Sequence, residues 1–447
     1  MLDERIAEWR DHVGRRQAME TADLDELEDH LRSQVRDLRS AGLDQEEAFL
    51  IAVKRMGALD ALSEEYAREY SERLWKRLVM PPGAGGGGWN REATVAVGLA
   101  VAAGVAIKIP ELFGIPWDGQ AGTLWYGQNL SLLVLPFLAI FLGWKRAMPV
   151  RGWMGLAGGF LAAALVVNLM PFVPEGYTMA LAIIHLPIAL WLALGVAYAG
   201  GEWRDPRQRM NFVRFSGEWF IYYVLIALGG GVLMAITMLL FEAAGMDAEP
   251  LVTLWILPCG AVGAVIIAGW LVEAKQSVIE NMAPVLTMLF TPLFTLLLLA
   301  FLGTVAWTGS GINIEREVLI AFDLLLVVVV ALHLYAISAR DPHAEPGLFD
   351  RLQFVLVVSA LLVDAMALWA ILARITEFGF TPNRTAALGE NLILLVNLAG
   401  AAVLYTRFLT GRTDVASMER WQTRFLPVYL TWAMAVVVLF PLIFGFI

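Results

Sequence analysis

The sequence predicts an all-α fold: a polytopic α-helical integral membrane protein with about 11 transmembrane helices and an N-terminal cytoplasmic helical bundle. Composition is the first reason, because 58% of the 447 residues are hydrophobic and only 17% are charged. Soluble domains average roughly 45–50% apolar and about 25% charged residues, so most of this chain is expected in lipid. Charge placement is the second reason, because 32 of the 74 charged residues lie in residues 1–80.

Residues 1–80 are predicted to form a bundle of four helices. In the second helix the apolar residues recur every three or four positions: Leu24, Leu27, Leu31, Val35 and Leu38. Asp44 and Glu47 have the spacing of a capping box at the start of the third helix, which Gly57 ends. The other two predicted helices are 6–16 and 59–80. Segment 81–91, rich in Pro and Gly, is the predicted flexible linker to the membrane domain 92–447.

Eleven stretches of about 20 mostly apolar residues are long enough to cross a bilayer. They are 93–113, 124–144, 153–173, 178–200, 219–243, 251–272, 283–307, 318–339, 352–373, 391–409 and 425–446. The loops after even-numbered spans, counted with Arg407 at the end of the tenth span, hold 14 Lys and Arg residues, and those after odd-numbered spans hold 3. Positively charged loops stay in the cytoplasm. The N-terminal domain is therefore predicted to be cytoplasmic and the C-terminus external, in the plasma (inner) membrane.

Ionisable side chains inside these spans are the main functional candidates, because each costs at least about 2.5–3.5 kcal/mol to insert. Asp364 lies near the predicted midplane, and His333 lies toward the cytoplasmic side. The other three lie in the outer half: Asp323, His185 and Lys108. The functional interpretation is an outward-facing polar cavity around Asp364, with Lys108 as a counter-charge. The structural alternative is that Lys108 and Asp323 reach the outer surface or pair together, and that His185 joins two helices.

The predicted ninth external loop, 374–391, is a second candidate site. It holds two arginines and two glutamates that can pair across a turn or clasp an external ligand: Arg374, Glu377, Arg384 and Glu390. Asn383 or Thr385 is expected to cap the following helix.

Several classes of function are disfavoured by composition. Cys259 is the single cysteine, which excludes a disulfide framework and a cysteine-based metal site. A net charge of −10 argues against nucleic acid as the main partner. The catalytic and phosphate-binding patterns HExxH, GxSxG and the P-loop do not occur. No cofactor or metal is expected, and an enzymatic function is the least favoured.

Two parts of the chain resemble known bacterial families. The segments Glu26-Leu-Glu-Asp-His-Leu31, 41–50 and Val53-Lys-Arg-Met-Gly57 resemble the permease prefix domain, a small helical module in front of bacterial membrane proteins. The stretch 374–384, with the following Ala387-Leu-Gly-Glu-Asn-Leu392, resembles the polytopic domain of unknown function 4153 family. The resemblance implies a membrane protein associated with permeases, and it assigns no catalytic residue.

Two functions fit these features. A transporter or permease-like protein fits the many spans, the short loops and the polar residues of the outer half, with an unknown small molecule or ion as ligand. A membrane sensor or scaffold fits the tethered acidic domain, which would recruit a cytoplasmic protein partner through residues 1–80. The lipid bilayer is the expected surrounding in both cases.

The predicted topology can be tested with fusions. A reporter that is active only in the cytoplasm is expected to be active before Met1 and inactive after Ile447, because the basic loops hold the even-numbered connections inside. Activity of the reporter at both ends would show that the number of spans or the orientation is wrong.

Overall fold

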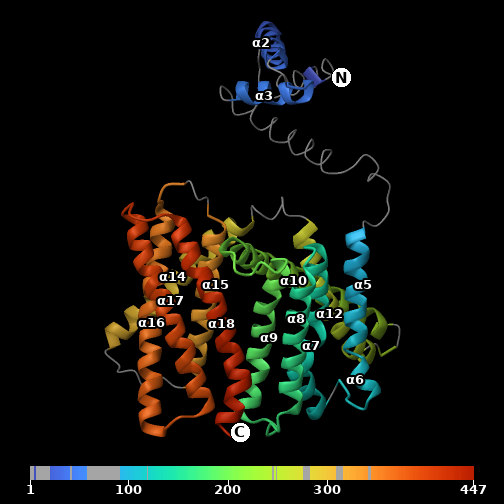
Figure 1. Ribbon diagram of the computed structural model, residues 1–447, viewed down its shortest axis with the longest axis vertical. Coiled ribbons are helices and arrows are strands. Elements are labelled where there is room, and N and C mark those ends of the chain that lie inside the picture. The colour runs from blue at the N-terminus through green and yellow to red at the C-terminus, as the bar shows by residue number, and fades with distance from the viewer. Residues whose placement is uncertain are drawn as a thin grey trace. The chain divides into compact units, whose positions relative to one another are not determined.

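The computed structural model describes residues 5–6, 21–40, 43–57, 91–117, 119–243, 246–247, 249–274, 282–308, 316–340 and 344–447. The chain divides into two compact units, Met1–Trp89 and Asn90–Ile447 (Figure 1). The predicted linker and the predicted helix 59–80 lie outside the described residues, as does nearly all of the predicted helix 6–16.

The first unit contains helices α2 (Thr21–Ser40) and α3 (Gln45–Gly57). Its core joins the apolar face of α2 to Phe49 and Val53 of α3 and to Ile6. Asp44 accepts hydrogen bonds from the backbone N–H groups of Glu46 and Glu47 at 2.6 and 2.8 Å. The Glu47 carboxylate in turn accepts from Asp44 N at 3.4 Å. This reciprocal bonding is the capping box that the spacing predicts.

The second unit contains eleven helices that are long and apolar enough to cross a membrane, and the described residues form no strand, which confirms the predicted fold class. The spans are α5 (Arg91–Ala106) with α6 (Ile109–Leu112), α7 (Gln120–Lys145), α8 (Val150–Leu169), α9 (Tyr177–Tyr198), α10 (Pro206–Ala243), α11 (Glu249–Leu251) with the π-helix (Val252–Ile256) and α12 (Leu257–Ala274), α14 (Met282–Thr308), α15 (Arg316–Ser338), α16 (Leu348–Phe378), α17 (Pro382–Leu409) and α18 (Val415–Ile443). The unit is therefore a multi-pass integral membrane protein.

Three helices begin well before the span predicted for them. Helix α10 starts at Pro206, α17 at Pro382 and α18 at Val415, each about three turns before its apolar stretch. The predicted loop 374–391 is wrong as a loop, because only residues 379–381 separate α16 from α17. Thr381 caps α17, accepting from Arg384 N at 3.4 Å, in place of the expected Asn383 or Thr385. An apolar window detects only the part of a helix that lies in hydrocarbon, not its polar ends.

The connections between spans lie at two ends of the unit (Figure 1). We call the end with loops 146–149, 199–205 and 410–414 the basic end. The opposite end holds α6, the α16–α17 turn and the C-terminus (Figure 1). There the backbone of Ile447 accepts a hydrogen bond from Thr178 N at 2.8 Å, which ties the end of α18 to the start of α9.

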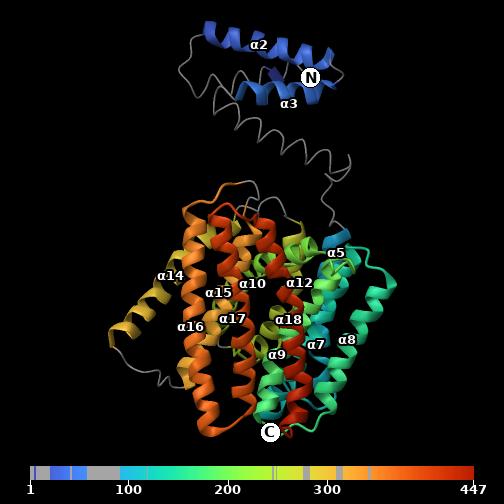
Figure 2. The ribbon, with the colours of Figure 1, turned by 60° about the vertical axis from the view of Figure 1, so that its left-hand side comes forward.

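The spans pack as two groups around two main cores, and α10 contributes side chains to both. The first helix group comprises α5, α7, α8, α9 and α12. The second helix group comprises α14, α15, α16, α17 and α18, of which α14 slants away from the others in Figure 2. Helices α9 and α18 form the main junction between the groups, which Leu181, Ala386 and Val436 fill. Large apolar side chains such as Leu228 and Leu296 are exposed on the outside, as lipid contact requires.

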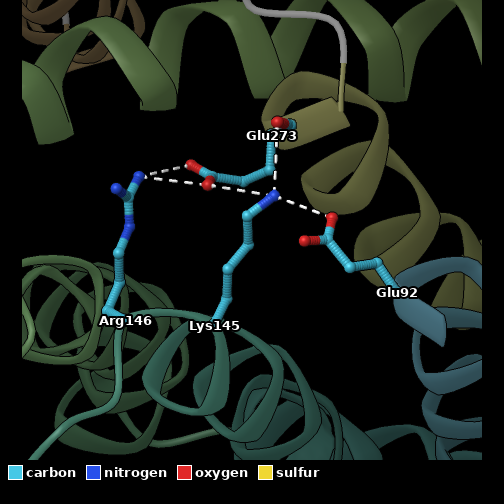
Figure 3. Close-up of polar contacts among 4 residues, drawn as sticks. All are labelled: Glu92, Lys145, Arg146 and Glu273. Carbon is cyan, nitrogen blue, oxygen red and sulfur yellow. Dashed lines mark hydrogen bonds and ion pairs between the residues drawn. The ribbon is translucent and has the colours of Figure 1, made fainter. Parts of the chain in front are cut away.

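A cluster of four charged residues joins α5, α7 and α12 at the basic end (Figure 3). Arg146 places one guanidinium nitrogen 2.8 and 3.0 Å from the two carboxylate oxygens of Glu273. Lys145 binds Glu92 at 3.0 Å and the carbonyl oxygen of Glu273 at 3.3 Å. The Glu273 side chain is only 2% exposed, whereas that of Glu92 is 36% exposed. Glu273 is therefore the buried centre of the cluster.

The two glutamates provide a matched test of burial. Glu273→Gln should lower the free energy of unfolding by about 3 kcal/mol, because Arg146 loses its buried counter-charge. Glu92→Gln should cost less than about 1 kcal/mol, because water solvates the more exposed Lys145–Glu92 pair. Denaturant titration in mixed micelles measures both. Equal costs for the two variants would contradict the assignment of Glu273 as the centre.

Candidate functional site

Buried and partly buried polar side chains lie near the junction of the two helix groups. His185 comes from α9, Asp323 from α15, Asp364 from α16, and Glu390 with Asn391 from α17. We call these five residues the carboxylate cluster. His185 and Glu390 each lie eight residues from the end of their helix at the opposite end of the unit. At about 1.5 Å per residue this is a depth of roughly 12 Å, which explains how two residues far apart in sequence reach the same level.

The contact between His185 and Glu390 joins the two helix groups. His185 Nε2 lies 2.6 Å from Glu390 Oε1, and His185 Nδ1 lies 2.8 Å from the carbonyl oxygen of Leu181. The carbonyl can only accept, so Nδ1 carries a proton. The contact at Nε2 then needs one further proton, held either by the imidazolium or by the carboxylic acid. The pair is therefore a site for one exchangeable proton, and the Glu390 side chain is 33% exposed.

Asn391 orients the second carboxyl group of the cluster. Its amide nitrogen donates to Asp323 Oδ1 at 2.8 Å and to the carbonyl oxygen of Ala387 at 2.9 Å. Because adjacent helix residues differ by about 100° in direction, Glu390 can face α9 while Asn391 faces α15. Glu390 is also close enough to Asp323 for their charges to interact. Residues 390 and 391 thus connect the His185 pair to Asp323.

Asp364 is the deepest group of the cluster. It is 0% exposed, and neither carboxyl oxygen has a hydrogen-bond partner among the described residues. Asp323 lies close enough to repel a negative charge on Asp364. A buried carboxylate without a donor or counter-charge is strongly unfavourable, so this side chain must be neutralised by a proton or a bound cation.

Of the four intramembrane residues predicted to meet, the structure places Asp323 near Asp364, whereas His185 pairs with Glu390 and Lys108 lies elsewhere. Lys108 binds Glu111 at 2.6 Å and lies over the rings of Trp255 and Trp117, 4.7 and 5.6 Å from their centroids. The prediction that Lys108 is the counter-charge of Asp364 is therefore wrong. Lys108 lies between α5 and α6, where a carboxylate three residues later and two aromatic faces stabilise its charge.

The four residues of the predicted ligand clasp have different surroundings. Glu390 belongs to the carboxylate cluster, and Glu377 is exposed near the end of α16. Arg384 donates to the carbonyl oxygens of Phe378 and Gly379 at 3.1 and 3.0 Å, and so closes the α16–α17 turn. Arg374 is partly buried on α16. The structure therefore assigns Arg384 to the turn rather than to a pair with Glu390.

Sequence reasoning missed most of a second set of buried polar residues, nearer the basic end, of which it named only His333. Gln353 Nε2 donates to Thr291 Oγ1 at 2.9 Å, and Asn397 Nδ2 donates to Gln422 Oε1 at 2.9 Å. His333 is 0% exposed, and neither ring nitrogen has a partner at hydrogen-bonding geometry among the described residues. Uncharged Asn and Gln inside predicted spans were the available signal, because lipid disfavours these side chains as well.

The carboxylate cluster is suited to acid–base exchange and to cation binding. Its three carboxyl groups and one imidazole are the groups that take up and release protons in membrane proteins. Among the described residues, no three His, Cys, Asp or Glu side chains converge closely enough to hold a metal ion.

Comparison with family models, curated proteins and solved structures finds no match to this chain. The geometry of the carboxylate cluster is therefore the basis for assigning a function.

Replacement of the unpartnered carboxyl should stabilise the protein. Asp364→Leu, similar in size, should raise the free energy of unfolding by about 1–3 kcal/mol, because it removes a buried polar group with no partner. Asn391→Leu is the matched control and should lower that energy by a similar amount, because Asp323 loses its donor. Thermal unfolding in detergent ranks the two variants. A destabilised Asp364→Leu would mean that Asp364 has a structural role.

Proposed function

We propose that the membrane unit is a transporter that binds a cation or proton at Asp364 and Asp323. The observation that supports this function is the fully buried carboxyl of Asp364, without a hydrogen-bond partner and beside a second carboxyl. Natural proteins retain such a destabilising group where function requires it. A cation or proton arriving at Asp364 would remove the cost of its charge, and its departure would restore that cost.

The position of the cluster supports transport rather than static binding. His185 belongs to the first helix group and Glu390 to the second, so the contact between them lies across a junction. Transporters commonly work by moving one helix group against another around a central site. Protonation of the His185–Glu390 pair would change the charge at this junction and thereby favour one arrangement of the groups. The partly exposed Glu390 gives the cluster access from the opposite end of the unit.

A sensor or scaffold is the second candidate. The first unit has its own apolar core and is compact by itself, as a recruiting module for a cytoplasmic partner requires. We propose the plasma membrane as the location and the cytoplasmic side for this unit, on the basis of the charged loops and of the resemblance to the permease prefix domain. Variants of this protein that leave ion flux unchanged but no longer bind a partner protein would support this second function.

Ion flux in liposomes tests the transport proposal. The purified protein is reconstituted, and H⁺, Na⁺ and K⁺ fluxes are measured under an imposed membrane potential. The wild-type protein should carry at least one of these ions faster than protein-free liposomes, and Asp364→Asn should return that flux to the protein-free level. Wild-type flux equal to that of protein-free liposomes for all three ions would contradict transport.

Asp414→Asn is the matched control for Asp364→Asn, because the chemical change is identical. Asp414 caps α18, accepting from Ser417 N at 3.0 Å, and Asn caps helices equally well. The control variant should retain the wild-type flux. Equal flux through Asp364→Asn and Asp414→Asn would show that Asp364 is not the binding group.

A further inference from the structure

Three neighbouring helices of the second helix group each carry two polar residues separated by a longer, mostly apolar segment. Helix α15 has Asp323 and, ten positions later, His333. Helix α16, which runs the other way, has Gln353 and then Asp364. Helix α17 has Asn391 and then Tyr405. At about 1.5 Å per residue, the two polar positions are roughly 15–21 Å apart along each helix.

The segments between these polar positions are mostly apolar and pack together; their buried polar exceptions are Ser359 of α16 and Asn397 of α17, which donates to Gln422. We call these segments the apolar layer. Its apolar members are buried side chains of a single core: Leu326, Val329 and Val330 of α15, Leu356, Val357, Ala360 and Val363 of α16, and Leu394, Leu398 and Ala401 of α17. The carboxylate cluster thus lies on one side of this mostly apolar layer and His333 on the other. An apolar constriction of this kind blocks ions until water enters it.

His333 connects the apolar layer to the basic end. Its ring centroid lies 5.4 Å from that of Tyr405, and both residues pack with Gln422 around a gap too small to hold a water molecule. Tyr405 is close enough to Arg340 and Asp350 for electrostatic interaction. Arg340 binds Asp350 through Nε at 2.7 Å and through a terminal nitrogen at 3.1 Å, where α15 and α16 meet the basic end.

We propose that the cation carried by this protein is a proton, and that His333 passes it between Asp364 and the basic end. This inference rests on the proposed transport function and names the ion and a second residue of the path. A buried imidazole can accept a proton on one ring nitrogen and release one from the other, and His333 is held by no hydrogen bond at full bonding geometry among the described residues. Gln353, Tyr405 and Gln422 are the polar groups near it that can stabilise the added proton.

The proposed steps conserve protons and charge. The carboxylic acid of Asp364 gives its proton, through water that enters the apolar layer, to a ring nitrogen of His333. This leaves a carboxylate and an imidazolium. The imidazolium then releases a proton to water at the basic end, beside Tyr405 and the Arg340–Asp350 pair. Asp364 regains a proton through Asp323 and the His185–Glu390 pair from the opposite end, so each cycle moves one proton.

Proton flux and the protonation of Asp364 are measured on the same proteins. Flux is followed in liposomes, and Asp364 through the carboxylic acid carbonyl band in infrared difference spectra between acidic and neutral samples, which Asp364→Asn should remove. His333→Gln should abolish the proton flux and retain the Asp364 band. His30→Gln is the matched control, because His30 lies in α2 of the first unit, and it should change neither quantity.

Two further variants keep the test decisive if His333→Gln does not fold. Tyr405→Phe removes only a hydroxyl group and should slow the proton flux. Leu398→Asn should speed it, because an amide in the apolar layer attracts water, and damage to the fold would not produce a faster, Asp364-dependent flux.

The outcomes separate this inference from the transport proposal. Unchanged proton flux in His333→Gln would overturn the role of His333 and leave transport intact. Asp364-dependent flux of Na⁺ or K⁺ with no proton flux would also overturn the role of His333 and leave transport intact. If His333→Gln lost both the flux and the Asp364 band, unchanged flux in Tyr405→Phe and Leu398→Asn would overturn the path. Flux unaffected by Asp364→Asn would contradict both proposals.

Discussion

Hydrocarbon offers no hydrogen bonds, and this constraint determines where every polar group of the membrane unit lies. Hydroxyl groups on exposed helix faces bond to their own backbone, as Thr237 does to Leu233 and Thr431 to Pro427, at 2.8 and 2.7 Å. Larger polar side chains gather between helices, where another helix supplies a partner. Asp364 and His333 are the ionisable side chains among the described residues of this unit for which both polar atoms are buried without a partner at hydrogen-bonding geometry. These two side chains are therefore the main candidates for a functional role.

The membrane unit contains two kinds of buried charge, and their surroundings separate structure from function. Glu273 is almost wholly buried, but Arg146 and Lys145 neutralise it and join three helices. Asp364 is equally buried and has beside it a second carboxyl instead of a cation. The first arrangement stabilises one conformation. The second is tolerable only while a proton or cation is bound, so its energy depends on ligand and on the arrangement of the helices.

The junction between the two helix groups gives the carboxylate cluster its mechanical setting. Interdigitated apolar side chains hold α9 against α18 and leave His185 facing Glu390 of α17. A proton gained or lost by this pair therefore changes the charge at the boundary between the two helix groups. The apolar layer within the second helix group separates this boundary from the basic end.

The sequence by itself determined the fold class, the eleven spans and the candidate residues Asp364, Asp323 and His185, because apolar length and intramembrane charge are local properties. It did not determine where α10, α17 and α18 begin, because the first turns of these helices are more polar than the apolar stretches that follow. Only the tertiary structure decided that Lys108 pairs with Glu111, and that Glu390 contacts His185 instead of the arginines of the predicted clasp. These partners depend on how helices far apart in sequence pack and rotate against one another, and the spacing of residues along one helix does not contain that information.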